Sequence, residues 1–217
     1  MDNGGTERIK QALADLCEPL HDVFAEAGAS KLLQPPAEED LDHVPDFSGR
    51  HYGWLRTHIV RAHAHFRLNQ RNLDPWRLSG KHQRNGELWM TDGDYRLRIL
   101  HGPSETDVPP PGRNGARRAY FHNPALPLAE PMFGPPNDRL LVLWHIHPIT
   151  GEPSFRVVRP IGDWKYGGKA QVDVDFPLPQ TSDDLINMQF NPSDDEIHLS
   201  IPNEEEGNDF RAGGISG

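Results

Sequence analysis

Residues 87–100 read ELWMTDGDYRLRIL, and this stretch carries the signature of a β-hairpin. Asp92-Gly93 is a dipeptide that tight hairpin turns favour, because glycine readily adopts a positive φ. After the turn, Tyr95 to Leu100 alternates in polarity with the period of two that a half-buried strand shows. We therefore expect two antiparallel strands here, and we interpret the rest of the chain around them.

Segments on the C-terminal side continue the strand pattern. Arg139 to His147 is an apolar run suited to a buried strand, and Thr150-Gly151 then turns the chain so that Ser154 to Val158 pairs back in a second hairpin. Ala170 to Phe176 alternates cleanly and predicts a strand with one wet face. Weaker strand candidates are residues 186–190 and 196–201, and residues 117–122 predict either a short strand or a helical turn.

Two helices are predicted on the N-terminal side. The first begins with Thr6 as N-cap and stops near Gly28, with Pro19 expected to kink or split it near Glu18. Its apolar positions are Ile9, Leu13, Leu16, Leu20 and Phe24. The second runs from Ser48 to about Asn69, and its apolar stripe is expected to face the sheet. That stripe consists of Tyr52, Leu55, Ile59, Ala62 and Phe66.

Helices followed by strands predict an α+β fold rather than alternating βαβ units. We expect two N-terminal helices packed on a mostly antiparallel sheet of five to seven strands. Residues 1–201 are predicted to form a single domain, with a helical part over 1–72 and a β part over 76–201. Residues 202–217 are acidic, glycine-rich and almost without apolar anchors, which predicts a disordered tail.

Composition points to a cytoplasmic protein. The only cysteine among the 217 residues is Cys17, so no internal disulfide can form, as suits a reducing compartment. The first residues lack the basic and apolar regions of a signal peptide, and no apolar run approaches the roughly 18–20 residues that span a bilayer. We therefore expect no membrane partner; the sequence does not indicate an oligomeric state.

Charge divides the chain into three blocks. Residues 1–48 carry 3 Lys/Arg and 11 Asp/Glu, residues 49–118 carry 13 and 6, and residues 119–217 carry 6 and 15. A net +7 segment thus lies between segments of −8 and −9. Two interpretations stay open: the acidic parts neutralise the basic part internally, or the basic part forms a face that binds an acidic protein or nucleic acid.

The second predicted helix places basic residues on one flank. At about 100° per residue, Arg56, His63 and Arg67 fall within roughly 40° of one another, and Arg71 would join them one turn later. Together with basic residues farther along the chain, this flank is the candidate binding face. Its members are Arg56, His63, Arg67, Arg71, Arg96, Arg98, Arg117 and Arg118.

Arg56 and His63 also define an enzymatic alternative. Their spacing resembles the Arg-x(4–6)-His motif of HEPN ribonucleases, in which the two residues act on the scissile phosphate. The resemblance implies a phosphodiesterase or metal-independent ribonuclease. Because those families are helical and most of this chain predicts strands, the sequence leaves open whether the protein is an enzyme.

No metal or cofactor is predicted. His145-Ile146-His147-Pro148 followed by Ser154 resembles a segment of JAMM zinc metalloproteases, but the required downstream aspartate position holds Val157. Asp94-Tyr95-Arg96 resembles half of the PD-(D/E)xK nuclease motif, yet arginine stays protonated and cannot readily take the place of the lysine. The phosphate-binding and nucleophile motifs of the common cofactor and hydrolase families are missing.

A broader resemblance rests on Tyr95–Leu100, Arg117–Phe121 and Leu141–Trp144 with Arg159-Pro160. Over residues 50–180 the chain resembles an uncharacterised bacterial family often encoded beside helix-turn-helix regulators and ImmA-like metallopeptidases. This resemblance implies a role in a toxin–antitoxin or phage-defence locus. The leading hypothesis is an interaction or regulatory protein whose basic face binds an acidic protein or nucleic acid.

Overall fold

A six-stranded sheet forms the centre of the computed structural model, which describes residues 3–29, 52–84, 86–102, 106–111, 115–123, 138–147, 150–162 and 170–188. The strands lie across the sheet in chain order. They are β1 (Arg77–Ser79), β2 (Trp89–Thr91), β3 (Tyr95–His101), β4 (Asp138–Ile146), β5 (Pro153–Ile161) and β6 (Gln171–Leu178). Every neighbouring pair is antiparallel except β3 and β4, which run parallel. The predicted α+β class with a mostly antiparallel sheet is confirmed.

Both predicted hairpins are present. Met90 of β2 lies opposite Leu97 of β3, and the turn between the strands is closed by Asp92, whose Oδ1 accepts the backbone N–H groups of Asp94 at 2.9 Å and Tyr95 at 2.7 Å. Gly93 has φ +110°, a conformation that a side chain would strain. The second hairpin joins β4 to β5, and β6 then pairs with β5.

The two predicted hairpins do not account for the parallel pairing of β3 with β4. Parallel neighbours need a long crossover, because the chain must return to the same end of the sheet. That crossover includes α4 (Gly115–Tyr120). Of the two structures predicted for residues 117–122, the helical turn is therefore the correct one.

The N-terminal helix is interrupted, as predicted, but earlier than Glu18. α1 (Asn3–Leu13) passes through a 3₁₀ turn, η1 (Ala14–Leu16), into α2 (Cys17–Gly28). Pro19 has no N–H, and its ring collides with the carbonyl four residues before it, that of Asp15. The break accordingly falls in the turn that precedes the proline.

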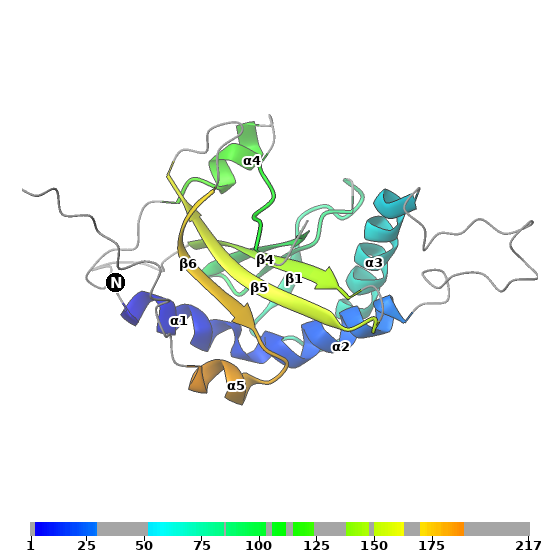
Figure 1. Cartoon of the computed structure of the whole chain (residues 1–217), viewed down its shortest axis with the longest axis horizontal. Helices are drawn as coiled ribbons and strands as arrows, with labels where there is room; N and C mark the ends of the chain where they lie inside the picture. Colours follow the sequence, from blue (N-terminus) through cyan, green and yellow to red (C-terminus); the bar gives the residue numbers. More distant parts are fainter. Residues whose placement is uncertain are drawn as a thin grey trace, which may run out of the picture. The chain divides into compact units, whose positions relative to one another are not determined.

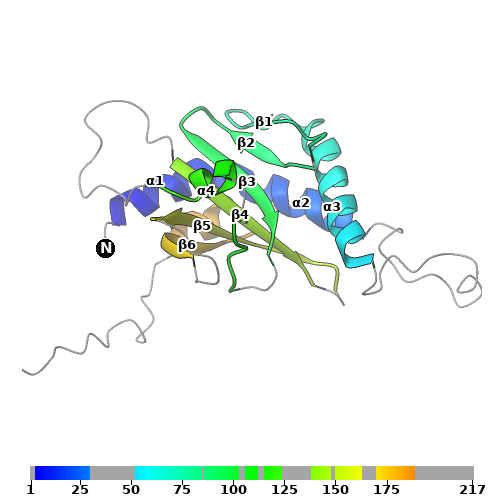
Figure 2. The ribbon, with the colours of Figure 1, turned by 90° about the horizontal axis from the view of Figure 1, so that it is seen from above.

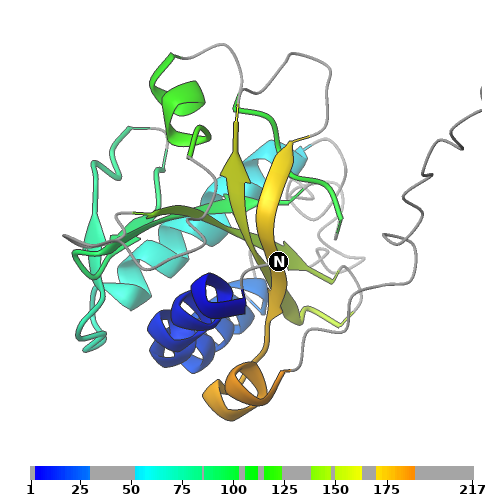
Figure 3. The ribbon, with the colours of Figure 1, turned by 90° about the vertical axis from the view of Figure 1, so that its left-hand side faces the viewer.

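α1 and α2 lie along one face of the sheet, while α4 lies on the opposite face (Figures 1 and 3). Phe24 of α2 anchors the main core, with its ring 5.1 Å from that of Phe155 and 5.3 Å from that of Trp144. Leu97, Leu140 and Val157 are fully buried in this core, which explains why β3, β4 and β5 carry apolar residues on this face of the sheet.

α5 (Ser182–Asn187) places residues 186–187 in a helix, where a strand over residues 186–190 was predicted; residues 189–190 lie outside the described set. Thr181 begins the helix as a cap: its Oγ1 accepts the N–H of Asp184 at 3.2 Å and donates to the Asp184 carboxylate at 2.7 Å. This reciprocal capping pattern is a helix start signal. It outweighs the short apolar run that suggested a strand.

α3 (Gly53–Leu68) packs mainly on α2, and the residues that it buries are not the predicted ones. Val60, Ala64 and Leu68 are buried, whereas Phe66 is 58% exposed. The buried positions recur every four residues on the side roughly 160° from the predicted stripe. Small and branched side chains allow α3 to lie close to α2. The face that α3 buries is therefore not the face that carries its larger apolar side chains.

The elements from α1 to α5 belong to one compact unit that ends at Asn187. The predicted N-cap Ser48, the strand over 196–201 and the tail over 202–217 lie outside the described residues. Within the described ranges, none of the helices has the length and apolarity that crossing a membrane would require.

Candidate anion-binding site

The basic flank of α3 lies beside α2, where acidic side chains meet part of it. Arg67 Nε lies 2.8 Å from the Glu26 carboxylate. Arg71 contacts both Asp22 at 3.0 Å and Glu26 at 3.6 Å. The two arginines therefore use their charge within the molecule, as the internal-neutralisation interpretation expects.

Arg56 and His63 lie on the same flank of α3, two helical turns apart. Arg56 is half-buried near the end of β3: burial, His145, Arg61 and Arg56, in that order, lower the pKa of His101. The Nδ1 atom of His63 is buried and has no hydrogen-bond partner among the described residues. They share this helix with Arg67, but they are not among the residues that line the cavity described below.

Arg96 and Arg98 lie on β3, two residues apart, so both side chains extend from the sheet face that carries α4. Arg96 is exposed. Arg98 is only 6% exposed, and its guanidinium carbon lies 5.3 Å from the centre of the Trp89 ring. This stacked arrangement fixes the direction of one cationic group and is worth about 0.5–2 kcal/mol in general.

Arg139 completes the group, and sequence reasoning missed it. In the parallel register it is the direct partner of Arg96, so two arginines stand side by side on adjacent strands. Its guanidinium also donates to the backbone carbonyl of Ala119, in α4. Like charges at paired positions destabilise a sheet by about 0.2–1 kcal/mol unless something compensates them. Among the described residues, no carboxylate lies at ion-pair distance from Arg96, Arg118 or Arg139.

α4 lies over β3 and β4 (Figure 2), and two buried polar side chains hold it there. The Tyr120 hydroxyl lies 2.7 Å from the carbonyl oxygen of Arg96 and 2.9 Å from that of Leu140. Burial raises the pKa of Tyr120, so the hydroxyl stays protonated and can donate. Asn123 donates to the carbonyls of Arg139 and Pro160 at 2.9 and 2.7 Å, which ties the end of α4 to β4 and β5.

The structure thus divides the predicted binding residues into two groups. Arg56, His63, Arg67 and Arg71 belong to α3 and its end. Arg96 and Arg98 lie below α4, and Arg118 is exposed on it; the backbone of Arg117 is in α4, and its side chain is outside the described set. We call Arg96, Arg98, Arg118 and Arg139 the arginine face. The sequence signal for Arg139 was the long connection between β3 and β4, which allows a parallel pairing.

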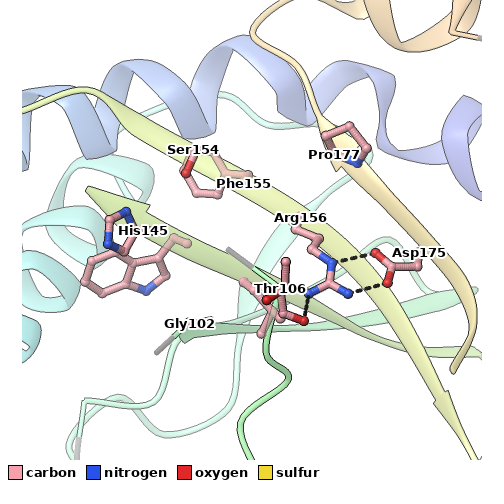
Figure 4. A pocket seen from close by; sticks show the side chains of 10 residues that line it. Gly102, Thr106, His145, Ser154, Phe155, Arg156, Asp175 and Pro177 are labelled. Atoms are coloured by element: carbon pink, nitrogen blue, oxygen red, sulfur yellow. Dashed lines mark hydrogen bonds and ion pairs between the residues drawn. The ribbon is translucent and has the colours of Figure 1, made fainter. Parts of the chain in front are cut away.

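A cavity of about 420 Å³ opens on the same sheet face, over β4, β5 and β6 (Figure 4). Its two formally charged lining residues pair with each other: the Arg156 guanidinium donates to both carboxylate oxygens of Asp175 and to the Thr106 carbonyl. The bond to Asp175 raises the pKa of Arg156. His145 and Ser154 line the cavity from paired strand positions. This cavity includes none of the predicted site residues.

Within the described ranges, no group of three or more His, Cys, Asp or Glu side chains is placed to hold a metal ion. His147, the second histidine of the zinc-protease-like segment, instead accepts the N–H of Thr150 at 3.1 Å.

Fold and site together describe an α+β protein with a mixed six-stranded sheet and a surface group of arginines. Comparisons with family profiles, curated sequences and solved structures find no match for this chain.

Proposed function

We propose that this protein binds nucleic acid through the phosphates, using the arginine face formed by Arg96, Arg98, Arg118 and Arg139. The observation that carries the proposal is the side-by-side pairing of Arg96 with Arg139, for which the described part of the chain supplies no carboxylate. An anion between the two guanidinium groups would turn an unfavourable pair into a favourable one. Phosphate suits this position because guanidinium forms two parallel hydrogen bonds to it.

Residue type favours nucleic acid over an acidic protein as the partner. All four members of the face are arginines, and arginine makes up 17 of the chain's 22 Lys and Arg residues. Carboxylates also pair with arginine, but a nucleic-acid backbone carries a series of phosphates that can bind several adjacent guanidinium groups at once. Arg98, almost fully buried over the Trp89 ring, adds positive charge beneath these exposed groups.

We place this activity in the cytoplasm, where a chain whose only cysteine is the buried Cys17 needs no disulfide. The resemblance to a bacterial family encoded beside helix-turn-helix regulators suggests regulation in a toxin–antitoxin or phage-defence locus. In such a setting the protein would act by binding, without turnover.

The test is a filter-binding titration of the full chain with a single-stranded RNA and a DNA duplex across a salt series. We expect binding that weakens with salt, because each phosphate contact releases counterions. Replacing Arg96 and Arg139 by glutamine should reduce affinity about tenfold. It should also make the salt slope shallower by about one unit for each arginine–phosphate pair that the substitutions remove.

The matched control replaces Arg67 and Arg71, which are paired with α2, by glutamine. This variant also loses two charges but should bind almost normally. If it loses as much affinity as the Arg96/Arg139 variant, general charge and not the arginine face governs binding. Absence of binding to either nucleic acid at micromolar protein in low salt contradicts the proposal, and equally tight binding of polyglutamate would favour an acidic protein partner.

A second candidate function is phosphodiester cleavage by Arg56 and His63. The observation that favours it is the buried His63 Nδ1 without a hydrogen-bond partner among the described residues. Buried polar atoms in this state are uncommon in native proteins, and a catalytic role is one of the reasons for which they occur. Cleavage needs a group that exchanges protons near neutral pH, which histidine supplies.

A further inference from the structure

α3 presents an apolar surface on the side that faces away from α2. Phe66 is 58% exposed and Tyr52 37%. At about 100° per residue, Leu55, Ile59, Ala62 and Phe66 form one line over three turns. We call these four residues the outer stripe. It is the same periodic pattern that predicts a core face from the sequence, yet this face is not the one that α3 buries.

An apolar line of this regularity differs from scattered surface leucines. Single exposed apolar residues are common and carry no meaning, whereas a contiguous patch marks an interaction site. Spacings of four, three and four residues fit the face of a partner helix, because helices recognise grooves and one another through such positions. Leu55 and Ile59 are half-buried, so the exposed part of the stripe is centred on Ala62 and Phe66.

Charge around the stripe indicates the chemistry of the partner. α3 contains no Asp or Glu in its 16 residues. Arg56 and His63 lie on one side of the outer stripe, and His58 lies on the other, where the Arg61 guanidinium donates to its Nδ1 atom at 3.2 Å. Among the described residues, no carboxylate lies at ion-pair distance from Arg56. A partner that covers the stripe therefore meets basic groups on both sides.

We propose that the outer stripe of α3 binds an acidic amphipathic helix of another protein, with apolar residues in its centre and carboxylates along its edges. A second copy of this chain fits less well, because α3 against α3 brings arginine against arginine. An anionic membrane also fits less well, because a bilayer is broad enough to be repelled by the whole molecule, whose net charge is −10. A single helix is affected only by the charges within a Debye length of about 8–10 Å.

This surface is separate from the arginine face, since α3 lies at one end of the sheet and α4 lies over β3 and β4 (Figure 2). The inference therefore stands or fails independently of nucleic-acid binding. The Arg96/Arg139 glutamine variant should bind the acidic helix normally.

The experiment measures fluorescence anisotropy of labelled synthetic peptides titrated with the full chain. The probe is an amphipathic peptide as long as the 16-residue α3, with leucines at helical spacing and glutamates beside them. One comparison peptide has lysines in place of the glutamates, and another has the acidic sequence scrambled. We expect only the acidic amphipathic peptide to bind, and more weakly as salt rises from about 0.05 to about 0.3 M.

Phe66→Ser should weaken this binding at least about tenfold, because it removes a central aromatic side chain from the interface. The matched control is Ile186→Ser, at another exposed large apolar residue on α5, which is 47% exposed and should leave binding unchanged. Because both positions are exposed, both variants should keep the wild-type melting temperature within about 2 °C.

Several outcomes overturn the proposal. These are absence of binding at about 100 µM protein, equal binding of the lysine or scrambled peptide, and equal weakening of binding in the two variants. A dimer in sedimentation that Phe66→Ser dissociates would assign the stripe to a second copy. Binding to phosphatidylserine vesicles that Phe66→Ser abolishes would assign it to a membrane.

Discussion

At the scale of single residues, Arg159 shows how a charge can occupy the core. Its side chain is 1% exposed, and its guanidinium reaches Asp138 Oδ1 through Nε at 2.9 Å and Nη2 at 2.6 Å. A third nitrogen, Nη1, reaches Asp173 Oδ2 at 2.6 Å. Strands β4, β5 and β6 are thereby joined through one side chain. The group is tolerated because the two carboxylates and the guanidinium desolvate together.

Arg159→Met should lower the free energy of unfolding by about 3–5 kcal/mol, because it leaves the Asp138 carboxylate buried without its cation. Urea unfolding followed by circular dichroism measures the change. Adding Asp138→Asn to the variant removes the uncompensated charge and should restore part of the stability. Equal stability of Arg159→Met and the wild type would mean that the ion group contributes little.

His65 carries a pH dependence. Its ring stacks on that of His82 at 3.9 Å, and burial, followed by the His82 charge, lowers the pKa of His65 from its ordinary value of 6.5. The unfolded chain therefore takes up this proton at a higher pH than the folded chain. Stability is unaffected above pH 6.5 and falls as pH decreases from 6.5 through the folded pKa.

We expect His65→Gln to lose less stability than the wild type between about pH 7.5 and pH 5.5, because the variant has no proton to bind there. Thermal melting across this range, compared between the two proteins, isolates the contribution of His65 from that of the carboxylates. If the wild type and His65→Gln lose the same amount of stability between these two pH values, His65 is not the group responsible.

At the scale of elements, α3 is the helix whose sequence pattern and packing disagree. Leu68 is fully buried, so Leu68→Ala should lower the free energy of unfolding by about 2–5 kcal/mol. Phe66→Ala should cost less than about 1 kcal/mol, since its ring is largely exposed. Urea midpoints of the two variants decide between the observed and the predicted face. The reverse order of effects would mean that the stripe of Phe66 is the packed one.

Local signals predicted the elements that local chemistry determines. The β2–β3 hairpin follows from Asp92-Gly93, and the break before α2 follows from Pro19, because both depend on residues a few positions apart. The parallel pairing of β3 and β4 depends on where a long crossover returns, which no short pattern contains. The buried side of α3 depended on the shape of α2, and periodicity alone cannot distinguish a core face from a binding face.

The candidate site was predicted in part for the same reason. Arg96 and Arg98 could be assigned to one sheet face from strand alternation alone. Arg139 could not be placed beside Arg96 without the parallel register. Arg67 could not be recognised as neutralised without knowing that Glu26 lies on the neighbouring helix. Sequence thus identified basic residues, and only tertiary structure separated the paired ones from the arginine face.

At the scale of the whole molecule, the three charge blocks are partly joined by folding. The acidic first block meets the basic middle block where Asp22 and Glu26 contact Arg67 and Arg71. Other charges of the middle block, on β3 and α4, extend from the opposite side of the sheet. Internal neutralisation and an anion-binding face are therefore compatible, each in a different part of the molecule.

This separation makes binding and cleavage distinguishable in one set of assays. If the protein is a ribonuclease that uses α3, His63→Ala should abolish cleavage of a labelled RNA and leave its binding within about twofold, because it removes the proton-transfer group and none of the arginines of the arginine face. Replacing Arg96 and Arg139 by glutamine should instead weaken binding and affect cleavage only through occupancy. If the protein only binds, wild type at micromolar concentration retains RNA without cutting it, and His63→Ala changes nothing. Cleavage that persists unchanged in His63→Ala would exclude His63 as the proton-transfer group, and the buried Nδ1 atom would then need a structural explanation.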